Sequence, residues 1–91
     1  MTDHTQQRIL ERASGWPEVS MAEVKKAEKH PQAQRGHCAC IIAFRGRQAF
    51  VVIVRYGQAV TAYPVDRTRA NSKHLRVPCV VNLVKETAAV H

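Results

Sequence analysis

Three polar residues near the start of the chain recur at every fourth position, His4, Arg8 and Arg12. Residues four apart lie on the same face of an α-helix, so this spacing predicts a row with one imidazole and two guanidinium groups. An imidazole can exchange a proton near neutral pH, and guanidinium groups bind phosphate oxygens. The row is suited to holding a phosphate and moving a proton. The alternative is a solvated helix face beside an apolar stripe.

Cysteines form a second candidate group. Cys38 and Cys40 are two apart in a predicted strand and so share a face, while Cys79 belongs to a later strand and His30 lies upstream. Two thiolates and an imidazole could begin a tetrahedral zinc site. Zinc sites more often use a C-x-x-C turn, and free cysteine commonly behaves as a small buried hydrophobe. We therefore predict core cysteines, with no metal and no cofactor, and keep a zinc-stabilised domain as an alternative.

Positive charge is concentrated in the later part of the chain. Residues 1–30 carry five basic and five acidic side chains, whereas residues 31–91 carry nine basic and two acidic ones, which accounts for the whole net charge of +7. Arginine predominates, and its planar fork matches phosphate oxygens. Such a patch is typical of nucleic-acid binding, although a solubilising surface or an acidic protein partner would also explain it. The arginines predicted to contact nucleic acid are Arg12, Arg45, Arg47, Arg55, Arg67, Arg69 and Arg76.

Length and composition predict one domain over residues 1–91. No apolar run approaches the roughly 18 residues of a membrane span, and the polar start lacks the apolar region of a secretory signal. We expect no membrane association and a cytoplasmic location, where cysteines stay reduced. The odd number of three cysteines also argues against a closed disulfide framework.

The helices that would position these residues are expected at the start. Residues 3–13 carry Ile9, Leu10 and Ala13 at helical spacing, and Gly15 and Pro17 stop that helix. A second helix over residues 21–30 begins with the capping-box pair Ser20 and Glu23. Val19 and Val24 are spaced for a hydrophobic staple, and Pro31 ends the helix.

Strands are expected after the helices. Runs rich in β-forming residues cover residues 37–44, 49–56, 59–63 and 77–84, with turns at Gly46 and Gly57 and a polar loop over residues 64–75. The unbroken apolar run of residues 50–54 indicates a central strand that is buried on both faces. Pro78 favours an edge position for the last strand. The predicted fold is α+β, with two N-terminal helices packed on one face of a four-stranded antiparallel sheet, in the order α-α-β-β-β-β.

Several of these features together resemble a known group of proteins. The His4, Arg8 and Arg12 row, a turn, a capped second helix and a strand pair ending in the step Thr61, Tyr63 and Pro64 are similar to small bacterial and phage domains of unknown function. Those domains are related to the barnase/EndoU/colicin/RelE-type ribonuclease fold. The resemblance covers roughly residues 3–66. The turn over residues 14–19 is longer than usual there, and the segment after Pro64 has no counterpart.

The resemblance implies an RNA-binding domain and a metal-independent, toxin-like endoribonuclease. In that chemistry the 2′-hydroxyl attacks the adjacent phosphate, a base takes its proton and cations stabilise the oxyanion. His4 is then the base or acid, and Arg8, Arg12 and Arg55 are candidate phosphate ligands. Thr61 and Tyr63, two apart on one strand, would position the sugar–phosphate. Without the resemblance, these two are equally typical of a β-forming residue and a half-buried aromatic.

A non-enzymatic function is the main alternative. A small phage or mobile-element protein that binds and inhibits a host protein needs no proton-transfer group at His4. The expected partners are RNA and, with the arginine-rich surface, an acidic protein such as an antitoxin or a host factor.

Overall fold

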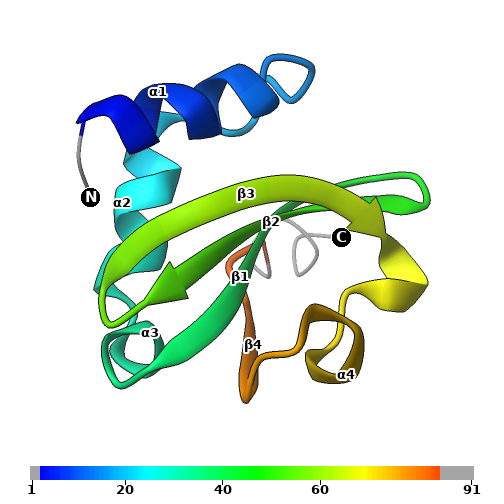
Figure 1. Cartoon of the computed structure of the whole chain (residues 1–91). Helices are drawn as coiled ribbons and strands as arrows, with labels where there is room; N and C mark the ends of the chain where they lie inside the picture. The colour runs from blue at the N-terminus through cyan, green and yellow to red at the C-terminus, as the bar shows by residue number, and fades with distance from the viewer. Residues whose placement is uncertain (1–2, 85–91) are drawn as a thin grey trace.

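The computed structural model describes residues 3–84 of the 91-residue chain. Three helices precede three strands, and a 3-10 helix, a short α-helix and a last strand follow (Figure 1). The elements of this described part are α1 (Asp3–Arg12), α2 (Met21–Lys29), α3 (Pro31–Gln34), β1 (His37–Arg45), β2 (Gln48–Arg55), β3 (Gln58–Asp66), η1 (Arg67–Arg69), α4 (Ser72–Leu75) and β4 (Cys79–Asn82). The α+β class is confirmed. Within residues 3–84, no helix is long and apolar enough to cross a membrane.

The sheet is mixed, so the prediction of an antiparallel sheet was wrong. Its strand order is β3-β2-β1-β4; β1 and β3 each pair antiparallel with β2, whereas β4 pairs parallel with β1. The chain leaves β3 at one edge of the sheet and reaches β4 at the other edge through η1 and α4 (Figure 1). A crossover of this kind produces a parallel pair, which a tight hairpin cannot do.

Two apolar clusters lie on opposite faces of the sheet. The larger one joins α1, α2 and α3 to the sheet through residues such as Ile9, Val24 and Phe50. The smaller one packs Leu75 and Val77 of the crossover against the other face. In β2 every residue from Ala49 to Val54 is buried, which confirms the central strand. The two N-terminal helices pack on one face, as predicted, whereas the short α4, which the sequence did not predict, contributes to the opposite face.

The second helix is held by burial rather than by a capping box. Ser20 is its N-cap residue, but the Ser20 side chain makes no capping hydrogen bond, so that predicted interaction is not formed. Val19 and Val24 are both buried in the larger cluster, as the staple required. Pro31 ends the helix as predicted and also begins the short α3, for which it supplies a favourable first residue.

The edge strand β3 is longer than the sequence suggested. It runs to Asp66 instead of ending near Tyr63, and Pro64 is tolerated because β3 has β2 on one side only. A register shift beside Ile53 and Val54 leaves Val60 without a partner, and Val60 is exposed. This shift is a β-bulge, and bulges re-aim the side chains near them.

Candidate functional site

The polar row of the first helix lies where the spacing predicted. His4, Arg8 and Arg12 are exposed, while Ile9 and Ala13 anchor α1 to the core. The helix packs on β3, and a pocket of about 240 Å³ lies between them. Its lining residues are His4, Thr5, Arg8, Ile9, Arg12, Val60 and Thr61. The fold therefore brings together four of the residues that the sequence nominated, from two segments about 50 residues apart.

Arg12 joins the helix row to the strand through hydrogen bonds. Nη1 of Arg12 donates to Oγ1 of Thr61 at 2.7 Å, and lies 3.4 Å from the carbonyl oxygen of Ala62. A guanidinium has five N–H donors, so Arg12 retains donors for a ligand after this contact. The bond also fixes the Thr61 hydroxyl in a pocket that is lined by an imidazole and by guanidinium groups. We call this pocket, defined by His4, Arg8, Arg12 and Thr61, the α1–β3 pocket.

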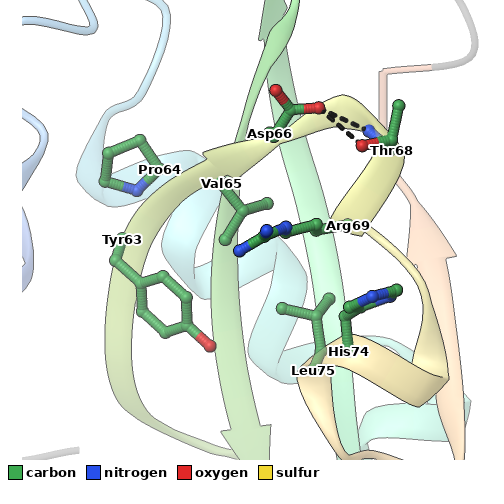
Figure 2. Close-up of a pocket in the computed structure, with 8 residues that line it drawn as sticks. All are labelled: Tyr63, Pro64, Val65, Asp66, Thr68, Arg69, His74 and Leu75. Atoms are coloured by element: carbon green, nitrogen blue, oxygen red, sulfur yellow. Dashed lines mark hydrogen bonds between the residues drawn. The ribbon is translucent and has the colours of Figure 1, made fainter.

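Tyr63 does not join the α1–β3 pocket. Thr61 pairs with Ile53 and Tyr63 with Val51, so the two side chains do share a strand face. Tyr63 nevertheless packs against the smaller apolar cluster and lines a different pocket of about 640 Å³, next to the crossover (Figure 2). Arg69 and His74 also line it. Sequence reasoning missed His74, because only the crossover brings it to β3.

Four of the predicted arginines gather at one end of the sheet. Arg45 ends β1, Arg47 lies in the turn between β1 and β2, and Arg67 and Arg69 follow β3. The backbone N–H of Arg67 donates to the carbonyl oxygen of Arg47 at 2.6 Å, which holds the two segments together. A pocket of about 360 Å³ there is lined by Gly46, Arg47, Asp66, Arg67 and Thr68. We call Arg45, Arg47, Arg67 and Arg69 the hairpin-end cluster.

Aromatic rings and carboxylates fix the members of this cluster to different degrees. Arg45 lies 4.6 Å from the centroid of the Trp16 ring and 3.5 Å from a carboxylate oxygen of Glu18. Arg67 lies 4.2 Å from the centroid of the Phe44 ring. Guanidinium groups over aromatic faces are held in place while their N–H edges stay available.

Asp66 is an acidic side chain close to Arg47 and Arg69 of the cluster. Hydrogen bonds from the Thr68 backbone N–H at 2.9 Å and the Thr68 hydroxyl at 2.8 Å lower the pKa of Asp66, and the charges of Arg69 and Arg47 act in the same direction. The carboxylate therefore stays ionised and caps η1. One carboxylate beside Arg47, Arg67 and Arg69 leaves this surface positive.

Two of the predicted arginines lie away from the cluster. Arg55 pairs with His37 at the far end of β2, about 23 Å from Gln48 at roughly 3.3 Å per residue. Arg76 follows α4 and leads into β4, whose first residue pairs with Cys38 near the start of β1. The arginine-rich surface is thus divided by the fold, which a count along the sequence could not reveal.

The cysteines occupy core positions. Cys38 and Cys40 are fully buried, and Cys79 is half-buried beside them. Burial raises the pKa of Cys38 far above its usual range and raises the pKa of Cys40 to about 11. Among residues 3–84, no group of three or more His, Cys, Asp or Glu side chains is arranged to hold a metal ion. The buried thiols fit the interpretation that these cysteines are packing residues.

Comparison with protein-family models, with curated proteins and with solved structures gave no match for this chain. The resemblance to the ribonuclease fold stays a prediction, and the function has to be argued from the geometry.

Proposed function

We propose that this chain binds RNA and cleaves it by attack of a ribose 2′-hydroxyl on the adjacent phosphate, without a metal ion. The observation that carries the proposal is the α1–β3 pocket. It gathers His4, Arg8, Arg12 and Thr61 around one cavity, and the Arg12–Thr61 contact of 2.7 Å ties the strand to the helix row. This reaction needs a group that transfers a proton and cations that stabilise the charge on the phosphate, and the pocket contains both.

The reaction uses these side chains in complementary ways. The 2′-oxygen forms a bond to phosphorus while the bond from phosphorus to the 5′-oxygen breaks, so the products carry a 2′,3′-cyclic phosphate and a 5′-hydroxyl. His4 acts as the general base that takes the proton of the 2′-hydroxyl, and solvent water supplies the proton to the departing 5′-oxygen. Arg8 and Arg12 donate to the phosphate oxygens, on which negative charge accumulates. Thr61, held by Arg12, contacts the sugar–phosphate.

The remaining positive charge supports binding along β3. The α1–β3 pocket includes Val60 and Thr61, the pocket beside the crossover includes Tyr63 to Asp66, and the hairpin-end cluster follows at Arg67. Each of these three places along β3 therefore includes an arginine, namely Arg8 and Arg12, then Arg69, then Arg67. Phosphate contacts of this kind position a nucleic acid without reading its sequence.

The reaction is tested with a DNA oligonucleotide that contains one ribonucleotide. Wild-type protein should cut only on the 3′ side of that ribonucleotide and leave a 2′,3′-cyclic phosphate and a 5′-hydroxyl. The matched all-DNA oligonucleotide should remain intact. A 5′-phosphate product, or equal cutting of the all-DNA strand, would exclude 2′-hydroxyl attack. A failure to cut any RNA would reduce the proposal to RNA binding.

A second candidate function is inhibition of a host protein by binding. It is favoured by Tyr56, which is 69% exposed and adopts φ +50 at the turn between β2 and β3. Exposed Val60 lies on the strand that follows. An aromatic side chain held out on a turn is typical of a protein-contact residue. In this case replacing Tyr56 abolishes the activity, whereas His4→Ala leaves it intact.

A further inference from the structure

The pocket beside the crossover has the composition of a ligand site. Its volume of about 640 Å³ lies within the usual range for small-molecule sites. Val65 and Leu75 give it an apolar part, and the polar side chains include Tyr63 from β3 and Arg69 and His74 from the crossover (Figure 2). An apolar surface with a few polar groups, contributed by segments remote in sequence, suits one ligand with an aromatic and a charged part.

Hydrogen bonds determine the tautomer of His74. Nδ2 of Asn71 donates to the Thr68 carbonyl oxygen at 2.9 Å, so Oδ1 of Asn71 faces His74. That oxygen accepts from the backbone N–H of His74 and lies 3.0 Å from its Nδ1. An amide oxygen can only accept, so Nδ1 carries the proton and Nε2 of the neutral ring is a hydrogen-bond acceptor. Asn71 is thus a positioning residue for the His74 ring.

The cation of the pocket is Arg69, an exposed residue of η1. Its guanidinium extends toward Tyr63 in Figure 2, while the Asp66 carboxylate turns to Thr68. Asp66 also lines the pocket and its charge partly offsets that of Arg69. Because Thr68 donates twice to that carboxylate, the Arg69 fork keeps donors for an anion.

We propose that this pocket binds one ribonucleotide unit of an RNA strand. Arg69 donates to the phosphate, the Tyr63 ring contacts the base, and Nε2 of His74 accepts a hydrogen bond from the ribose 2′-hydroxyl. The last contact lets the pocket distinguish RNA from DNA, since only RNA carries that donor. This inference rests on the proposed RNA-binding function. It adds a specificity site on the same edge strand as the α1–β3 pocket, on the opposite face of the sheet.

Calorimetric titration of the full chain with uridine 3′-monophosphate, its 2′-deoxy analogue and inorganic phosphate tests the assignment. Uridine 3′-monophosphate should bind about threefold to tenfold more tightly than the deoxy analogue, as expected for one neutral hydrogen bond. Arg69→Ala should weaken the binding of both nucleotides by about tenfold or more. His74→Ala should remove only the ribose preference. Asn71→Ala should do the same.

Lys25→Ala, which removes one positive charge from exposed α2 outside both pockets, is the matched control and should leave mononucleotide affinity unchanged. Thermal melts of every variant identify any loss of folding. Unchanged binding by Arg69→Ala, or no heat at millimolar nucleotide, would overturn the inference even if the wild type cleaves RNA. Mononucleotide binding as described by a protein that cleaves no RNA would leave the site standing and remove the cleavage proposal.

The same ligand chemistry could come from an RNA strand or from a free nucleotide, and binding of a single-stranded RNA oligonucleotide distinguishes the two. If Arg69→Ala weakens both the oligonucleotide and the mononucleotide, the pocket is an RNA subsite, as we infer. If it weakens the mononucleotide alone, the ligand is a free nucleotide and the RNA assignment is wrong.

Discussion

The side chains proposed for catalysis carry little of the protein's stability. His4 and Arg8 are exposed, and the burial that anchors α1 comes from Ile9 and Ala13 on the other side of the helix. Function and folding are therefore separable at these positions, which makes them suitable for mutagenesis.

His4→Ala and Arg8→Ala should each change the free energy of unfolding by no more than about 0.5 kcal/mol, as is usual for exposed positions. Each should lower the rate of RNA cleavage by about 10²-fold or more, because a positioned proton-transfer group or oxyanion donor is lost. Gln7→Ala, an exposed residue of the same helix outside the pocket, is the control. If the two variants cleave RNA as fast as the control, the α1–β3 pocket is not the active site.

The buried thiols predict a pH dependence of stability. The pKa of Cys40 is raised to about 11 in the folded protein, whereas an unfolded cysteine ionises near a pKa of about 8.5. The unfolded state therefore loses its thiol proton first as the pH rises. The stability from this group is fully present below about pH 8.5 and is lost by about 1.4 kcal/mol per pH unit until the folded pKa is reached.

We expect Cys40→Ala to be less stable at neutral pH, because it leaves a small cavity, but to lose stability less steeply above about pH 9. Urea unfolding at several pH values between 7 and 10 gives the slope of the free energy of unfolding against pH for the wild type and for Cys40→Ala. Comparing the two slopes removes the effects of other ionising groups. Parallel curves for the two proteins would show that Cys40 is not held as a buried neutral thiol.

At the scale of elements, local patterns predicted much of the fold. The 3.6-residue periodicity placed α1 and α2, the Pro31 signal ended α2, and the apolar run of residues 50–54 identified the central strand. The parallel pairing of β4 could not be predicted, because it depends on where the polar segment after β3 crosses the sheet. That same crossover carries Arg69 and His74 to Tyr63, so the second pocket was invisible to sequence reasoning.

The four residues of the α1–β3 pocket meet for a specific reason. His4, Arg8 and Arg12 share a helix face by spacing alone, and Thr61 belongs to the strand on which that helix packs. Tyr63 was assigned to the same site by the resemblance, with its strand parity to Thr61 as support. Parity places two side chains on one face, but it does not say which neighbouring element each one meets.

The turn between β2 and β3 contains an avoidable strain. Tyr56 and Gly57 both have positive φ, of 50° and 79°, which matches a two-residue type I′ turn. Asn and Gly suit the first of these positions, and a bulky aromatic does not. Tyr56→Asn should raise the free energy of unfolding by about 0.5–1 kcal/mol, because little burial is lost from a side chain that is 69% exposed.

Chemical unfolding of wild type, Tyr56→Asn and Tyr56→Phe measures this effect. The phenylalanine variant keeps the strain and should match the wild type. A destabilised asparagine variant would mean that the Tyr56 ring makes a contact that stabilises the fold. The same variants serve the alternative function, since Tyr56→Asn should remove binding to a protein partner if Tyr56 is the contact residue.

At the scale of the whole molecule, charge is the dominant feature. A net charge of +7 on 91 residues is distributed so that Arg45, Arg47, Arg67 and Arg69 meet at one end of the sheet. Arg45 is partly neutralised by Glu18, and Asp66 offsets part of the rest. We expect this positive surface to attract a polyanion, and we expect salt to weaken that attraction by screening the charges.

The most direct test of RNA binding is the salt dependence of the affinity for a single-stranded RNA, measured by fluorescence anisotropy. Each neutralised phosphate contributes about −0.7 to the slope of log K against log salt concentration. Contacts from Arg47, Arg67 and Arg69 would therefore give a slope of about −2 or steeper. Arg67→Gln should flatten it by about 0.7, whereas Lys25→Gln, the same charge change on exposed α2, should leave it unchanged. A flat slope, absence of binding at low salt, or equal effects of the two substitutions would contradict the account.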